Sequence, residues 1–82
     1  MKLTYDARHN VAYIRLREKT EDVETLKISD ELFVDITPDG RVYGIEFLNA
    51  NEQIRSADNG EFVLIDDIRG TQQSLRLPPA AE

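Results

Sequence analysis

Apolar and polar positions alternate over most of the first 48 residues of this chain. Such alternation is typical of half-buried β-strands, whose successive side chains point to opposite faces of a sheet. Polar breaks that are typical of turns interrupt it about every ten residues, which favours an antiparallel meander. The pattern predicts five strands, at residues 3–5, 11–17, 23–29, 32–36 and 41–47.

The turn before the fifth strand has the strongest local signal. In Thr37–Gly40, Pro38 has the fixed φ that suits the second position of a type I turn, and Gly40 accepts the positive φ that follows. This predicts a three-residue loop that closes on a G1 bulge, with Asp35 opposite Tyr43. A two-residue turn would collect the apolar residues on one face more cleanly, but the turn residues argue against it.

In the bulged register both faces of this hairpin are partly apolar. One face would carry Leu32, Val34, Ile36, Val42 and Glu46, and the other Phe33, Asp35, Tyr43, Ile45 and Phe47. Gly44 interrupts the fifth strand, so either a bulky neighbour crosses above it or the sheet bends there. Close approach by the backbone of a partner is the functional alternative.

The remaining residues predict little regular structure. Asn49 and Glu52 resemble a capping box, which predicts a short helix from about residue 50 to 57. The apolar run Phe62–Ile65 is either a buried strand or a turn of buried helix, and its β-branched and aromatic residues favour the strand. We therefore expect an α+β fold: one compact domain at residues 1–70, with five or six antiparallel strands, and a disordered tail at residues 71–82.

Composition narrows the possible functions. The 82 residues include 16 acidic and 10 basic side chains, so the net charge of −6 opposes nonspecific binding to nucleic acid. The chain has no cysteine, which excludes disulfides and thiolate metal sites and fits a reducing compartment. Neither a signal peptide nor an apolar run of about 20 residues is present, so we expect a cytoplasmic protein that does not enter a membrane.

Four sequence blocks, in this order, resemble a known family. They are Tyr5-Asp6, Val11–Leu16, Val34-Asp35 and Asp39–Ala50. Together they are similar to the small prokaryotic family catalogued as domain of unknown function 2283, over residues 3 to about 51. The chain departs from it at Pro38, where the family's turn is usually acidic, and continues some thirty residues further. The resemblance implies no established activity, so no catalytic role or cofactor follows from it.

Acidic residues of the same hairpin imitate a calcium-binding loop. Asp35, Asp39 and Glu46 fall at positions 1, 5 and 12 of the EF-hand pattern. The flanking segments, however, are predicted to be strands rather than helices, and the bulged register sends Asp35 and Glu46 to opposite faces. A metal-dependent, hydrolase-like enzyme using these three carboxylates is the alternative function. Because of the two objections just given, we expect no metal site and no cofactor.

Other chemical groups fit ordinary structural roles. His9 is the only histidine and lies in a predicted turn, where solvation is expected. A hydrogen bond between Tyr43 and Asp35 is expected to hold the hairpin rather than to catalyse a reaction. Tyr13, Arg15 and Arg17 share one strand face, which would suit single-stranded nucleic acid, but the acidic net charge argues against it.

The sequence therefore favours a non-enzymatic interaction module that binds its own copy or a small partner protein. The reason is a sheet with apolar residues on both faces and too little helix to cover one of them. The candidate interaction residues are Tyr13, Phe33, Tyr43, Gly44 and Phe47.

Overall fold

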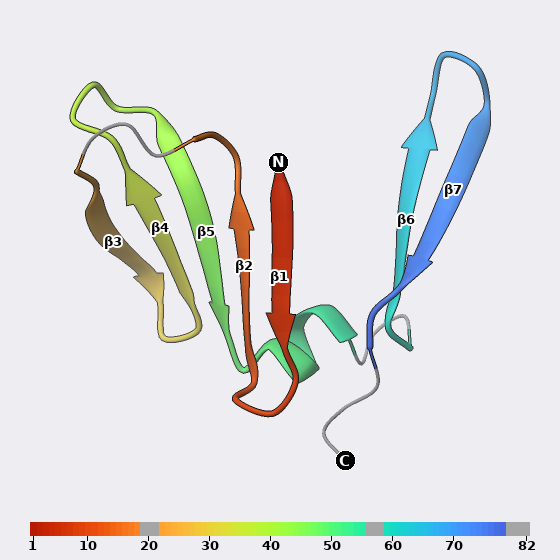
Figure 1. The fold of residues 1–82 in the computed structure, drawn as a ribbon, viewed down its shortest axis with the longest axis horizontal. Coiled ribbons are helices and arrows are strands. Elements are labelled where there is room, and N and C mark those ends of the chain that lie inside the picture. Colours follow the sequence, from red (N-terminus) through yellow and green to blue (C-terminus); the bar gives the residue numbers. More distant parts are fainter. Residues whose placement is uncertain (19–21, 56–58, 79–82) are drawn as a thin grey trace.

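The computed structural model describes residues 1–18, 22–55 and 59–78, and nearly all of their regular structure is antiparallel β-sheet (Figure 1). One sheet has five strands: β1 (Lys2–Asp6), β2 (Val11–Arg15), β3 (Glu24–Ser29), β4 (Leu32–Ile36) and β5 (Val42–Leu48). Two further strands, β6 (Glu61–Asp66) and β7 (Thr71–Arg76), form a separate hairpin. The five predicted strands are confirmed, each to within two residues at either end.

The order of strands across the sheet is β1-β2-β5-β4-β3. The expected meander is therefore wrong at one step, because β2 pairs with β5 rather than with β3. Consecutive strands are neighbours in only about two-thirds of cases, so alternation alone does not fix this step. Thus β5, the last of these five strands along the chain, lies at the centre of the sheet.

The predicted turn between β4 and β5 is confirmed. Gly40 has φ +88°, and its amide donates to the carbonyl of Thr37 over 2.9 Å. A second bulge follows, however, because Asp35 pairs with Gly44 while Ile36 pairs with Val42. It leaves Tyr43 without a cross-strand partner in β4, so the predicted pairing of Asp35 with Tyr43 is wrong.

The second bulge separates apolar from polar side chains, because cross-strand partners share a face. We call one side the apolar face: Leu3, Tyr5, Ala12, Ile14, Leu26, Leu32, Val34, Ile45 and Phe47. We call the other side the polar face: Lys2, Thr4, Asp6, Val11, Tyr13, Arg15, Thr25, Lys27, Phe33, Asp35, Gly44, Glu46 and Leu48. The predicted assignment of residues to the two faces of the hairpin is therefore wrong, although Phe33 keeps the polar face partly apolar. Asp35 and Glu46, expected on opposite faces, share one.

The predicted helix is reduced to a π-helical turn, η1 (Asn51–Arg55), at the end of the sheet (Figure 1). Asn49 has φ +53°, outside the extended region in which a capping residue lies. Its carbonyl accepts the amides of Glu52 and Gln53, both over 3.1 Å, while its side chain bonds to Asn10. Residues 56–58, the predicted end of the helix, lie outside the described part of the chain. One such turn does not make an α+β fold, and the structure is mostly β.

The hairpin β6–β7 corrects the prediction for the end of the chain. Phe62–Ile65 lie in a strand, as their composition favoured. Residues 71–76, expected in a disordered tail, form β7. The turn is held by Asp66, whose carbonyl accepts the amide of Gly70 over 2.8 Å and whose Oδ1 accepts the amide of Ile68 over 3.0 Å. The last four residues, 79–82, are not among those described.

The fold is open and has little core. Among the described residues, the buried hydrophobic ones are Ala12, Ala50 and Leu77, and no large side chain is fully buried. The accessible surface is 6200 Å², whereas a compact monomer of 9.4 kDa exposes about 5,000 Å². The radius of gyration is 14.3 Å, against about 12 Å for a compact domain of this length. In the described part of the chain, no helix has the length and apolar character needed to cross a membrane.

Candidate interaction surfaces

The apolar face is a broad, nearly continuous hydrophobic surface. Its central row crosses all five strands, in the order Leu3, Ile14, Ile45, Val34 and Leu26. A second row, of Tyr5, Ala12, Phe47 and Leu32, lies beside it. Among these nine residues Ala12 is buried, Leu26 is 38% exposed and the other seven are half-buried, so solvent reaches part of most of the face.

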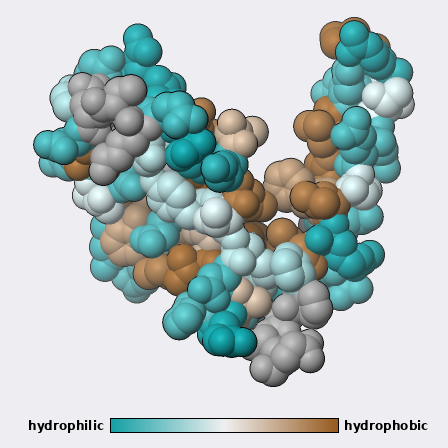
Figure 2. Space-filling view, in the orientation of Figure 1, coloured by the Kyte–Doolittle hydropathy of each residue, from teal (hydrophilic) through white to brown (hydrophobic). Residues whose placement is uncertain are grey.

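The second apolar surface belongs to the hairpin of residues 61–76, which we call the hairpin arm. Phe62, Leu64 and Leu75 share one side of it, with Phe62 directly opposite Leu75. They are 49%, 61% and 65% exposed, although side chains of these types are usually buried. Figure 2 shows apolar residues gathered on the inner side of the arm, across an opening from the sheet.

Hydrogen bonds at its base fix the hairpin arm to the rest of the chain. The amide of Gly60 donates to the carbonyl of Arg55, and that of Leu77 to the carbonyl of Gly60, both over 2.7 Å. The guanidinium of Arg55 donates to the carbonyl of Pro78 over 2.5 Å. Gly60 has φ +80° and Asn59 φ +54°, so two left-handed residues turn the chain into β6. The arm is thus anchored at its base while its apolar side chains stay exposed.

The polar face contains a clamp of three side chains. Asp35 accepts hydrogen bonds from the hydroxyls of Tyr13 and Thr25, each over 2.6 Å. Tyr13 lies across Gly44, where a Cβ atom would come 2.7 Å from Cε2 of the ring. A bulky neighbour above Gly44, one of the two predicted alternatives, is therefore confirmed. The hydrogen bond expected between Tyr43 and Asp35 is formed by Tyr13 instead.

This clamp is built for structure rather than for proton transfer. Desolvation of the phenol, followed by its hydrogen bond to Asp35, raises the pKa of Tyr13 well above its usual value. The ring of Tyr43, 6.5 Å from that of Tyr13 between centroids, extends the aromatic surface. A phenol that stays neutral and donates to a carboxylate ties strands together.

The three acidic candidates do not form a metal site. Among the described residues, no group of three or more His, Cys, Asp or Glu side chains could hold a metal ion. Asp35 and Glu46 share the polar face, so the predicted reason for their separation was wrong. Asp39 lies in the turn, where it accepts a hydrogen bond from the hydroxyl of Thr37 and forms an ion pair with Arg41 Nε at 3.2 Å. The hydrogen bond from Thr37 lowers the pKa of Asp39.

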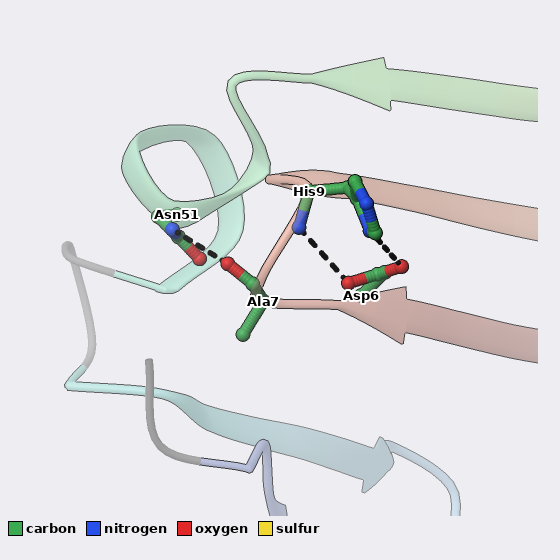
Figure 3. Close-up of polar contacts among 4 residues, drawn as sticks. All are labelled: Asp6, Ala7, His9 and Asn51. Carbon is green, nitrogen blue, oxygen red and sulfur yellow. Dashed lines mark hydrogen bonds and ion pairs between the residues drawn. The ribbon is translucent and has the colours of Figure 1, made fainter. Parts of the chain in front are cut away.

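His9 lies in the turn between β1 and β2, as expected (Figure 3). Its ring Nδ1 is 2.8 Å from Asp6 Oδ2, and its amide donates to Asp6 Oδ1 over 2.9 Å. These bonds, the backbone one first, lower the pKa of Asp6. Asn51 Nδ2 donates to the carbonyl of Ala7 over 3.5 Å, which ties the same turn to η1 (Figure 3). The pair formed by His9 and Asp6 is exposed to solvent and stabilises the turn.

The candidate interaction residues do not gather on one surface. Tyr13, Phe33 and Gly44 lie on the polar face, with the Tyr43 ring beside Tyr13, whereas Phe47 lies on the apolar face. Sequence reasoning missed the exposed residues of the hairpin arm. The available signal was the apolar run Phe62–Ile65, which was interpreted as a buried segment although few apolar residues surround it in sequence.

Comparison with known proteins places the sheet in a family. Residues 2–51 match the family described as proteins of unknown function, DUF2283. The matched segment holds the whole five-stranded sheet, while the hairpin arm lies beyond it. No curated protein and no solved structure matches the chain. Because the match covers more than half of the chain, the protein belongs to the DUF2283 family.

Proposed function

We propose that this chain is a non-enzymatic protein-interaction module whose binding surface is the apolar face. The observation that carries the proposal is a pair of hydrophobic rows, one across five strands and one across four, of which only Ala12 is buried. Antiparallel sheets normally pack one face against other parts of the protein. Apolar surface contributes about 25 cal/mol per Å² when it is removed from water, so covering this face stabilises an assembly.

The size and shape of the surface favour a protein as its ligand. The whole chain, hairpin arm included, exposes about 1,200 Å² more than a compact monomer of its mass, given its surface of 6200 Å². A stable protein interface covers about 800 Å² on each partner, so the excess is large enough for one. A small-molecule site is instead a concave pocket with a few convergent polar groups, and the apolar face is a flat sheet surface.

The test compares charged substitutions on the two faces. Ile45→Lys places a charge at the centre of the apolar face, and Thr4→Lys places the same charge on the polar face as the control. Tagged chains are purified from cells that also make an untagged copy, and bound proteins are identified by mass spectrometry. We expect the wild type and Thr4→Lys to retain bound protein and Ile45→Lys to lose it. Retention of the same proteins by both variants would contradict the proposal.

A further inference from the structure

We infer that the apolar face is covered by the hairpin arm of a second copy, exchanged reciprocally in a two-fold symmetric dimer. This inference rests on the proposed function and names its partner. It follows from two exposed apolar surfaces on the same chain, one on the sheet and one on the arm. A single symmetric contact covers both surfaces, because in a two-fold dimer the arm of each copy packs on the sheet of the other copy.

The arm does not cover its own sheet. Phe62, Leu64 and Leu75 are between 49% and 65% exposed, and the arm is anchored at its base by Arg55 and Gly60. Figure 1 shows β6 and β7 rising beside β1 and apart from the sheet. The chain thus presents an arm fixed at one end, with apolar side chains that its own sheet leaves in water.

The dimensions of the two surfaces agree. Six residues in each strand of the arm span roughly 20 Å. Five strands spaced by about 4.8 Å give the sheet a width of about 19 Å between its outer strands. An arm laid across the sheet therefore reaches from one edge to the other.

The area suits a stable dimer. An exchange that removed the whole excess of about 1,200 Å² from each chain, relative to a surface of 6200 Å² each, would bury at most about 2,400 Å² in total. Interfaces of that size occur in obligate homodimers, which are also the more hydrophobic class. The sheet face and the arm are both present on every copy of the chain. A second copy covers both with surfaces that are present at equal concentration.

Disulfide crosslinking tests the contact directly, because the natural chain contains no cysteine. Leu64→Cys on the arm and Ile45→Cys on the sheet are made in separate chains, mixed, refolded together and oxidised. We expect a disulfide-linked species of twice the 9.4 kDa chain mass, identified by peptide mapping as the 64–45 link. Lys27→Cys on the polar face replaces Ile45→Cys as the control and should give little of this product. An equal yield from both mixtures would overturn the inference.

A chain carrying both cysteines distinguishes exchange from folding back. A link within one chain keeps the 9.4 kDa mass and would overturn the inference, because the arm would then lie on its own sheet. Links between chains, which form dimers, support it. Because oxidation is scored by mass, the result does not depend on any activity.

Mixing two charged variants separates this inference from the proposed function. Leu64→Glu alters the arm and Ile45→Lys alters the sheet, and each should raise the dimer dissociation constant about tenfold or more in sedimentation. In a mixture, the unaltered arm of the Ile45→Lys chain can bind the unaltered sheet of the Leu64→Glu chain, so dimers should reappear. Circular dichroism confirms that each variant is folded.

The pattern of failure identifies which idea is wrong. If Ile45→Lys abolishes association and Leu64→Glu does not, the apolar face is an interface but the arm is not its occupant. If the wild type is monomeric while its apolar face still binds another protein, the exchange is likewise excluded and the proposed function stands. If neither variant changes any association, both are wrong.

Discussion

The hydroxyl of Tyr13 reaches across the central strand of the sheet to donate a 2.6 Å hydrogen bond to Asp35. Tyr13 lies on β2 and Asp35 on β4, and β5 separates these two strands. The bond passes over Gly44, the residue of β5 that pairs directly with Asp35. A side chain at that position would occupy the space of the phenol, so the glycine and the clamp depend on each other.

Replacing Tyr13 with phenylalanine should lower the free energy of unfolding by about 1–2 kcal/mol, because a hydrogen bond to a part-buried carboxylate is lost. Urea unfolding at equal m-values measures the change. Tyr43→Phe is the matched control, since the hydroxyl of Tyr43 is not part of the clamp. Equal losses in the two variants would contradict the role given to Tyr13.

The same residue should make stability depend on alkaline pH. The pKa of Tyr13 is raised in the folded state above the ordinary value of 10.0, so the unfolded chain releases this proton first. The contribution of Tyr13 is complete below pH 10 and is lost as pH rises from there through the folded-state pKa. Melting temperatures measured above pH 10 should therefore fall more steeply for the wild type than for Tyr13→Phe. Parallel curves would exclude the effect.

Gly44→Ala should destabilise the fold by about 1–3 kcal/mol, since the new methyl group would overlap the Tyr13 ring. Tyr13→Ala removes the ring and frees the space. In the double variant, Gly44→Ala should therefore cost less than it does alone, which a double-mutant cycle in urea measures. Strictly additive effects would mean that Gly44 is required for some other reason.

Gly40→Val should cost roughly 1–2 kcal/mol or more, because Gly40 has φ +88° and β-branched residues avoid that region. No atom lies within 4 Å of a Cβ placed there, apart from its chain neighbours, so the cost comes from the backbone rather than from a clash. Asp39→Ala should cost less, since it removes only side-chain bonds in an exposed turn. Urea unfolding of both variants tests the order, and a neutral Gly40→Val would contradict it.

The hairpin of β4 and β5 shows how far the sequence could predict the fold. Its turn residues correctly indicated a bulged loop, and its apolar pattern correctly indicated a single hydrophobic face. The two are incompatible in one regular register. The structure satisfies both, because the second bulge at Tyr43 restores the alternation that the first one shifts. A bulge at an ordinary tyrosine has no local sequence signal, because no turn residue marks its position.

The hairpin arm illustrates a different limit. Its second strand, residues 71–76, contains one apolar residue, so periodicity gives no reason to expect a strand. A turn signal was nevertheless present, because Asp66 and Gly70 are four residues apart and suit an aspartate-capped loop with a left-handed end. The exposed side chains of the arm could not be foreseen, because exposure depends on what the rest of the chain leaves uncovered.

The central position of β5 imposes an order on the assembly of the sheet. Before residue 48 has left the ribosome, β1–β2 and β3–β4 can exist only as two hairpins with no strand to join them. Isolated two-stranded hairpins are at best marginally stable in water. The two hairpins of the family segment therefore depend on β5 for their mutual contact, and the five-stranded sheet cannot be complete before β5 has been synthesised.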